Sequence, residues 1–280
     1  MSWADLVQNL QFYWVGLAAG GLIAVTCAYI GVYVVLKRIV FVGVSLAQIS
    51  AAGVALAFLV GQSIPFAAQH PFAVSMLVTM VGVLIYSQQG LSRKVPTESI
   101  IGIGYLAGAA LTVIFIARTP RGIHEVEELL YGNIIAVSPE NLRVVAGVAI
   151  AAALIHLLFY KQFLFVSFDR EMAATQGFRT RGWELLFYLV LGVVISVAIQ
   201  SAGLLTVFGC MVIPPVTGLL VARRMSTAFT ISIVCALVST VVGFYFSLKS
   251  EVLPTSPPTI ATMAVILAIV WFLKLFSREQ

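Results

Sequence analysis

Acidic side chains are scarce in this chain of 280 residues, which has 11 Asp and Glu in total and only two Asp, Asp5 and Asp169. Common hydrolytic sites in membranes are marked by an HExxH motif, a nucleophile elbow or paired carboxylates within the predicted spans, and none of these patterns occurs here. A membrane-embedded enzyme is therefore poorly supported. A phosphate-binding loop of the GxxxxGK[ST] type is also missing, so we expect ATP hydrolysis, where the protein needs it, on a partner chain.

Cysteine and histidine number only three each. Cys27, Cys210 and Cys235 lie inside apolar runs without CxxC spacing, which predicts small buried residues and not disulfides or a zinc cluster. The net charge of +5 comes from Lys and Arg placed mostly at the ends of apolar runs. Such placement sets orientation in a membrane and does not form a nucleic-acid-binding face. No permanently bound cofactor is expected.

Apolar residues dominate the composition, at 61% of the chain with a mean hydropathy of +1.06. Repeated apolar runs long enough to cross a bilayer predict an all-α polytopic membrane protein with about eight or nine transmembrane helices. We expect a single transmembrane domain over residues 1–280. The predicted spans cover about residues 13–36, 41–60, 72–86, 100–117, 142–160, 185–199, 204–222, 228–246 and 260–276.

Basic pairs between the spans predict the orientation. Lys37-Arg38, Arg93-Lys94 and Arg223-Arg224 each follow a span and, by the positive-inside rule, lie in the cytoplasm. The N-terminus is then outside and the C-terminus, near Lys274, is cytoplasmic. We expect the cytoplasmic membrane as the location.

The largest polar segment between two spans covers residues 165–183 and reads FVSFDREMAATQGFRTRGW. Its core, 168–180, predicts a short amphipathic helix that is broken by Gly177. Asp169 stands near the start of this helix and the arginines lie beyond its end, which suits the helix dipole. A short helix between two spans on the cytoplasmic side is the form in which a permease is coupled to a cytoplasmic motor protein. An ordinary cytoplasmic loop would have the same composition.

Proline and small residues mark two of the spans. Pro214-Pro215 lies in the middle of the seventh predicted span, where the lost backbone hydrogen bonds should break or kink the helix. Gly43 and Gly53, with serines and alanines between them, should permit close helix approach in the second span.

Four stretches of this sequence resemble the permease subunits of ABC-type metal-ion importers, the family that takes up zinc, manganese or iron. The first is VLKRIVFVGVSLAQISAAGVALAFL, which resembles the family's basic pair and its Gly-Asp-x-x-x-His signature. The others are ESIIGIGYLAGAAL with YGNIIAVSPENL, then SFDREMAATQGF, and then AGLLTVFGCMVIPPVTGLLVARRM followed by SPPTIA. Together they cover most of the chain in the family's order.

The resemblance implies a permease that works as a homodimer or heterodimer in the lipid bilayer. A cytoplasmic ABC ATPase subunit would bind each copy, and an extracytoplasmic substrate-binding protein would deliver the cargo. The polar segment becomes the coupling segment, with Asp169, Arg170 and Glu171 as ATPase contacts and Gly177 as its break. The resemblance implies no binding of nucleic acid and no catalytic residues in this chain.

The family's Asp and His are replaced here by Val44 and Gln48. Residues four apart share one helix face, so the family pair can offer an oxygen and an imidazole to one divalent cation. Valine cannot ligate, and a glutamine carbonyl is a weak neutral ligand. We expect Val44 and Gln48 to line the translocation pathway, together with Ser45, Pro214 and Pro215.

Other residues are candidates for metal ligation. Cys210 and Met211 are soft donors that would suit Cu(I), although apolar packing explains both. His156 is the one histidine inside a predicted span, and intramembrane ionisable residues favour a functional hypothesis, although its ring could simply reach a backbone carbonyl. His124 stands beside an acidic cluster in an outer loop, where it could gather cations or lie on a solvated face.

Three interpretations remain open from the sequence. The chain is a divalent-metal importer permease whose ligands have moved or whose cargo passes largely hydrated. Alternatively, the same architecture carries a metal chelate or small organic compound along a neutral pathway. In the third interpretation the chain is a non-transporting partner subunit that keeps the fold.

Overall fold

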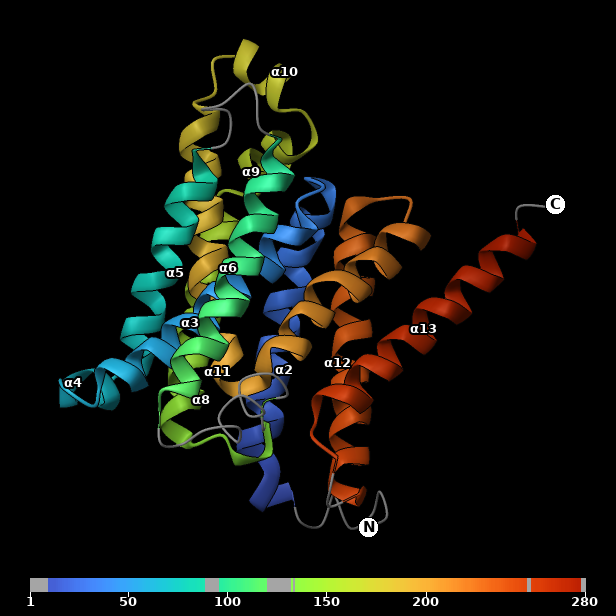
Figure 1. Ribbon diagram of the computed structural model, residues 1–280. Coiled ribbons are helices and arrows are strands. Elements are labelled where there is room, and N and C mark those ends of the chain that lie inside the picture. The colour runs from blue at the N-terminus through green and yellow to red at the C-terminus, as the bar shows by residue number, and fades with distance from the viewer. Residues whose placement is uncertain (1–9, 89–95, 120–131, 133, 251–252, 278–280) are drawn as a thin grey trace. The chain divides into compact units, whose positions relative to one another are not determined.

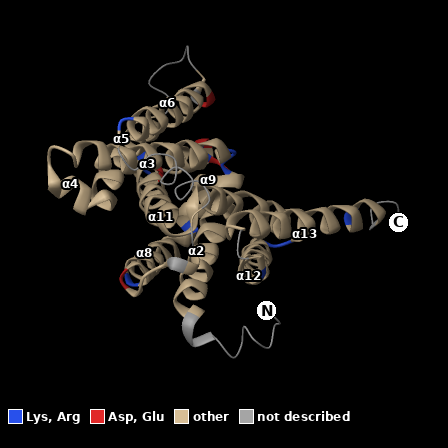
Figure 2. Ribbon diagram, turned by 60° about the horizontal axis from the view of Figure 1, so that its bottom comes forward, with Lys and Arg blue, Asp and Glu red and all other residues tan. Residues whose placement is uncertain are grey.

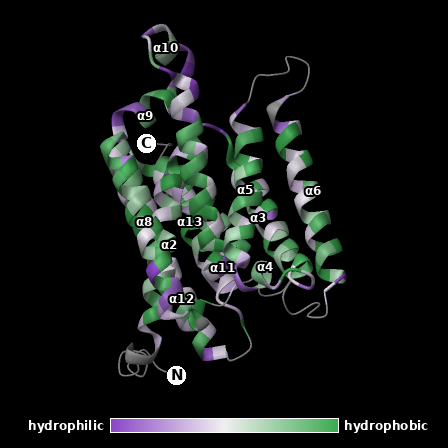
Figure 3. Cartoon of the chain, turned by 90° about the vertical axis from the view of Figure 1, so that its left-hand side faces the viewer, coloured by the Kyte–Doolittle hydropathy of each residue, from purple (hydrophilic) through white to green (hydrophobic). Residues whose placement is uncertain are grey.

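The computed structural model describes residues 10–88, 96–119, 132, 134–250 and 253–277. These residues are almost entirely helical and include no β-strand. Seven of the described helices are long and apolar enough to cross a membrane, which confirms the prediction of an all-α polytopic membrane protein. Hydrophobic residues extend along the lengths of these helices, and hydrophilic residues gather at their ends and at the segment around α10 (Figure 3).

The helices are named here in chain order, as labelled in Figure 1. They are α2 (Leu10–Leu36), α3 (Val40–Val60), α4 (Pro65–Gln69), α5 (Pro71–Ser87), α6 (Thr97–Ala117), the 3-10 helix η1 (Ile134–Ala136), α8 (Pro139–Leu158), α9 (Tyr160–Phe168), α10 (Arg170–Thr175), α11 (Thr180–Val221), α12 (Met225–Ser250) and α13 (Ser256–Ser277).

Most predicted spans coincide with one long helix each. Two helices, α5 and α11, depart from this pattern in length. Helix α5 has only 17 residues and is shorter than a typical span. Helix α11 has 42 residues and joins the sixth and seventh predicted spans across Gly203, whose backbone is not helical (φ 75°, ψ 160°). The break therefore falls at a glycine, because a positive φ is accessible to glycine without steric cost.

Of the break or kink predicted at Pro214-Pro215, the break is wrong, since α11 continues through both prolines to Val221, and the kink stays a prediction. Proline lacks an N–H, so the helix loses the bond from Pro215 to the Met211 carbonyl. The backbone of α2 approaches this same carbonyl at Gly31, where a Cβ atom would overlap the Met211 oxygen and lie 2.7 Å from Pro215 Cγ. Neighbouring helix backbone thus covers the group that proline leaves unpaired.

The chain folds into two compact units, each assembled from separate stretches of sequence. Unit 1 contains 1–35, 130–149 and 201–280, and unit 2 contains 36–129 and 150–200. The expectation of a single transmembrane domain stays a prediction. Charged residues are few and lie mainly near helix ends in both units (Figure 2).

Unit 2 is organised around α3, which packs side by side with α5 and α6 (Figure 1). Its contacts with α5 include a hydrogen bond between the hydroxyls of Ser50 and Ser75 at 2.8 Å. The predicted close approach at Gly53 is confirmed, because a Cβ there would lie 2.7 Å from the Cα of Ser75. Small residues bring these backbones together where larger side chains would hold them apart.

Unit 1 contains α2, the later part of α11, α12 and α13. Aromatic contacts join α2 to α12, with the Tyr29 and Tyr33 rings 4.8 and 5.2 Å from the ring of Phe229. At the Gly203 break, the hydroxyl of Ser256 donates to the Ala202 carbonyl at 3.3 Å. A side chain at the start of α13 thus satisfies a carbonyl beside the break in α11.

Replacing Gly31 by alanine tests the close approach in unit 1. The added methyl group would overlap the Met211 carbonyl, so we expect Gly31→Ala to destabilise the protein by about 1–3 kcal/mol, the usual cost of overpacking. Gly147→Ala is the matched control, since a Cβ there meets nothing within 4 Å. Thermal unfolding in detergent should show a lower midpoint for Gly31→Ala alone. An equal effect of both variants would contradict the contact.

Candidate functional site

The predicted polar segment forms three helical pieces in unit 2. Helix α9 ends at Phe168, α10 covers only Arg170–Thr175, and α11 begins at Thr180. The amphipathic helix predicted over 168–180 is therefore shorter than expected. Helix α10 and its flanking turns lie together at one end of unit 2 (Figure 1).

Asp169 separates α9 from α10 and caps the second helix. Its backbone is extended, at φ −148° and ψ 96°, and its carboxylate accepts a hydrogen bond from the Met172 N–H at 2.8 Å. This is the bond that an N-cap side chain supplies to an otherwise unpaired donor of the first turn. The chain thus reverses from α9 into α10 at a fixed angle.

Gly177 closes the other end of α10 in a Schellman motif. Its φ is +84°, its N–H donates to the Ala174 carbonyl at 3.1 Å, and the Phe178 N–H donates to the Ala173 carbonyl at 3.1 Å. The ring of Phe178 then packs edge-on against Phe165 of α9, with ring centroids 5.4 Å apart. The predicted break at Gly177 is confirmed, and its physical cause is the left-handed backbone.

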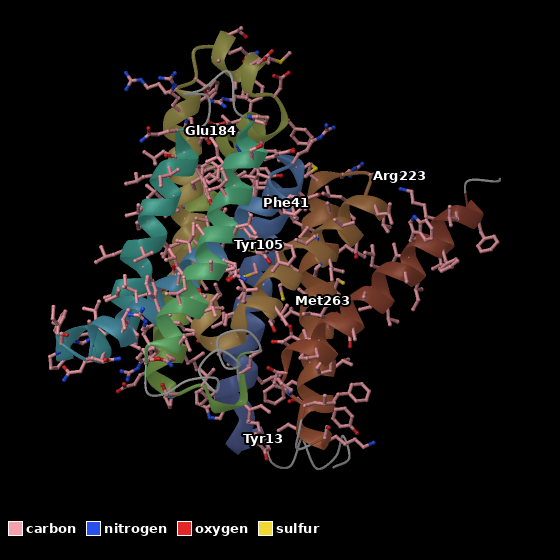
Figure 4. All side chains as sticks on the ribbon, viewed as in Figure 1. Tyr13, Phe41, Tyr105, Glu184, Arg223 and Met263 are labelled. Carbon is pink, nitrogen blue, oxygen red and sulfur yellow. The ribbon has the colours of Figure 1, made fainter. Side chains whose placement is uncertain are left out.

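An ion pair joins the coupling segment to α11. The Arg170 guanidinium lies 3.0 Å from the carboxylate of Glu184, whose side chain is only 12% exposed. Glu184 is labelled in Figure 4. Lys37, in the turn between α2 and α3, lies close to the same pair and has its Nζ 5.4 Å from the centre of the Phe187 ring. Burial lowers the pKa of Lys37, and Arg170 lowers it further, while Glu184 opposes the shift.

An aromatic cluster supports this end of unit 2 from inside. The His156 ring stacks on Phe163 at 4.6 Å, and Phe163 meets Trp183 and Phe187 edge-on at 5.8 and 6.2 Å. The Nδ1 of His156 donates to the Ala152 carbonyl at 3.0 Å, as expected for a buried ring that reaches a carbonyl. His156 is thus built into the packing of α8, α9 and α11.

The residues that replace the family's ligand pair lie on α3. Val44 and Gln48 are half-buried, whereas Ser45 is fully buried. The Ser45 hydroxyl shares a hydrogen bond of 2.5 Å with the Tyr86 hydroxyl of α5. Helix α6 packs closely against α3 at Gln48. A Cβ added at Gly108 of α6 would lie 3.1 Å from the Gln48 Cβ.

The remaining candidates lie in unit 1 or outside the described residues. Cys210, Met211, Pro214 and Pro215 are all buried within α11. His124 lies outside the described residues. Among the residues that the structure describes, no group of three or more His, Cys, Asp or Glu side chains could hold a metal ion.

Two residues of this site were missed by the sequence reasoning. Glu184 falls between the predicted polar segment and the sixth predicted span, and the sequence gives it no role; Lys37 is predicted only as one member of a basic pair that sets orientation. The signal for Glu184 was available, since it is the only acidic residue between Glu171 and Glu251. Its partner could not be read from the sequence, because the contact depends on how α10 folds back on α11.

Comparisons with known proteins agree with this architecture. The sequence profile of the family described as "ABC 3 transport family" matches residues 9–275. The chain is 25% identical to the "Manganese transport system membrane protein MntC" of Halalkalibacterium halodurans, over 99% of this chain and 91% of that protein. It is 27% identical to the "Probable iron transport system membrane protein" of Haemophilus influenzae, over 91% of this chain and 86% of that protein.

The fold also matches a solved structure. The structure titled "PsaBC from Streptococcus pneumoniae in complex with Fab" superposes with a TM-score of 0.83 and 23% identity, over 96% of this chain and 95% of that chain. At this identity the likeness concerns the fold. It supports the path of the helices described above.

The cap at Asp169 can be tested by amide hydrogen exchange. Asp169→Ala removes the bond to the Met172 N–H, so exchange in Arg170–Thr175 should become about fivefold faster, as expected for a cap of about 1 kcal/mol. Asp169→Asn keeps a capping oxygen and should exchange like the wild type. Equal acceleration in both variants would mean that the negative charge, and not the cap, holds α10.

Proposed function

We propose that this chain, which belongs to the ABC 3 transport family, is the transmembrane permease subunit of an importer that moves a divalent metal ion, with manganese as the favoured cargo. ATP hydrolysis would take place on a cytoplasmic ATPase subunit. The family membership and the names of the manganese relatives support this proposal.

The observation that carries the proposal is the construction of the coupling segment. An element that passes force from a motor to a membrane helix must be stiff. Helix α10 is capped at its start by Asp169 and closed at its end by Gly177, and Arg170 pairs with Glu184 of α11. The aromatic cluster around Phe163 then anchors the base of the segment. A solvated loop would need none of these contacts.

We propose different tasks for the charged residues of the segment, and their contacts support this division. Asp169 and Arg170 are engaged within the chain, so their contribution is to hold the segment in shape. Glu171 and Met172 are exposed, Met172 at 51%, and they form the surface that the ATPase subunit would contact. An exposed methionine suits a partner surface that adapts to its shape.

The assembly we propose has the remaining features of an ABC importer. The N-terminus lies outside the cytoplasmic membrane and the C-terminus inside, because basic pairs such as Lys37-Arg38 and Arg223-Arg224 favour the cytoplasm. A second permease copy, identical or related, completes the pathway. An extracytoplasmic binding protein delivers the cargo to it.

The pathway in this chain offers oxygen rather than imidazole or carboxylate. Gln48 supplies an amide oxygen on α3, a hard donor of the kind that Mn²⁺ accepts. One neutral ligand cannot replace the hydration shell of a divalent cation at low cost. We therefore infer that the ion passes with much of its water, and that Gln48 contacts it transiently.

The direct test is ATP-driven uptake into liposomes that contain this chain and its co-purifying ATPase subunit, with the cognate binding protein supplied outside. The panel contains manganese, zinc, iron(II) and copper. Uptake of manganese above the other metals is expected. If no metal enters although the binding protein stimulates ATP hydrolysis, the cargo assignment is wrong and the permease assignment stands.

Gln48 can be tested in the same assay. Gln48→Ala should reduce uptake by about tenfold or more, the loss expected when one polar contact to a charged group is removed. The double variant Val44→Asp with Gln48→His should lower the metal concentration needed for half-maximal uptake, because it places two strong ligands on one helix face. Gln69→Ala, exposed on α4, is the control and should behave like the wild type.

The ion pair of the coupling segment gives a second test. Arg170→Glu places two carboxylates together, so binding-protein-stimulated ATP hydrolysis should fall by about fivefold, as for the loss of a partly buried pair of about 1 kcal/mol. Glu184→Arg should act alike. The exchanged pair Arg170→Glu with Glu184→Arg should recover most of the activity. Failure of the exchange to rescue, with the ATPase subunit still bound, would remove the ion pair from the coupling mechanism.

A further inference from the structure

We propose that a cavity beside the coupling segment binds the phosphate headgroup of an anionic lipid at the cytoplasmic face of the membrane. The inference rests on the proposed function only for the side of the membrane. The cavity has a volume of about 530 Å³ and lies wholly within unit 2. Its walls are the turn Leu36–Ile39, the end of α9 from Val166 to Phe168, and Arg170, Glu184 and Tyr188.

Positive charge in this cavity exceeds negative charge. Lys37, Arg38 and Arg170 line it, and Glu184 is the one acidic residue among the lining side chains. Glu184 already pairs with Arg170 at 3.0 Å, so a single carboxylate serves two neighbouring cations. An anion inside the cavity would relieve the repulsion between Lys37 and Arg170. Basic pockets between helices at the cytoplasmic surface bind lipid headgroups in this way.

Arg38 occupies a backbone conformation that does not suit arginine. Its φ is +58°, and it is the one residue other than glycine with a positive φ among the described residues. The left-handed region costs a residue with a Cβ about 1–2 kcal/mol, whereas glycine adopts it freely. The side chain at this position therefore contributes something that the turn itself does not need. A long exposed cation at the rim of a basic cavity is suited to contact a phosphate.

The rest of the lining favours a lipid over a soluble anion. Phe168 lines the cavity and is 59% exposed. Phe41, the second residue of α3 (labelled in Figure 4), is 72% exposed. Large apolar side chains exposed beside cations suit an amphipathic ligand at the membrane interface. The volume corresponds to roughly 18 water molecules of about 30 Å³ each, room for a phosphoglycerol group rather than a single ion.

The test is a titration of the purified full-length chain in neutral detergent with phosphatidylglycerol, with bound lipid counted by native mass spectrometry. Phosphatidylcholine and inorganic phosphate are the parallel probes. We expect phosphatidylglycerol to bind much more tightly than either. Lys37→Gln with Arg38→Gln should weaken this binding by about 25-fold, or about fivefold for each charge removed. Lys37→Arg, which keeps the charge, should retain it.

The matched control is Arg223→Gln with Arg224→Gln. This pair also lies in an exposed turn between two helices and carries the same charge, but it lines no part of the cavity. We expect less than a threefold change. Equal weakening by both double variants would overturn the proposal in favour of non-specific attraction, and equally tight inorganic phosphate would replace the lipid by a soluble anion.

Two further measurements separate lipid binding from loss of folding and from binding of the ATPase subunit. If the Lys37/Arg38 double variant unfolds, judged by its helical circular dichroism, the single change at exposed Arg38 should still weaken binding about fivefold. If the bound ATPase subunit displaces phosphatidylglycerol, and the double variant no longer retains that subunit, the cavity belongs to the ATPase interface and the lipid proposal is wrong. Because the titration does not measure metal uptake, failure of the lipid proposal can be distinguished from failure of the proposed function.

Discussion

A peptide group inside a lipid bilayer has no water to bind, so every interruption of a helix must be compensated by the protein itself. Three interruptions among the described residues are relevant here: two lie within α11, and the third, at Asp169, lies at the surface. Ser256 donates to the carbonyl beside the Gly203 break, and the α2 backbone at Gly31 covers the carbonyl released by Pro215. At the third, the Asp169 side chain replaces the missing acceptor for α10. The arrangement of the helices follows from where these interruptions can be tolerated.

The interruption at Asp169 differs from the other two because it lies at the surface and carries the proposed function. Local bonds fix α10 at both ends, and the ion pair of Arg170 with Glu184 fixes it to α11. Lys37, beside that pair, belongs to the turn that leads into α3. A displacement of α10 would therefore reach the helix that carries Gln48 through a short series of contacts within unit 2. The proposed lipid site lies along the same route, so an anionic lipid would stiffen it.

Under the proposed function, Val44 and Gln48 stand where the resemblance to metal-ion permeases implies a carboxylate and an imidazole. Strong ligands hold a divalent ion and also slow its release, whereas a single neutral amide binds the ion more weakly and releases it faster. A pathway with weak ligands depends on the binding protein for selectivity. In the proposed mechanism, transport then depends more on coupling through α10 than on the affinity of the membrane pathway for the ion. The cap, the Schellman motif and the ion pair that fix α10 agree with this proposal.

The sequence alone determined the class of fold, the positions of most spans and the break at Gly177, because apolar length, basic pairs and a glycine after a short helix are local signals. The resemblance to metal-ion permeases also directed attention to Val44 and Gln48, whose place in the translocation pathway stays a prediction. The sequence did not reveal that α11 stays helical through Pro214-Pro215, where the backbone of α2 packs against the Met211 carbonyl. Likewise, the pairing of Glu184 and the basic cavity at Lys37 depend on residues far apart in the chain. Tertiary packing decided these features, because a buried charge or carbonyl is stabilised by whichever partner the fold brings to it.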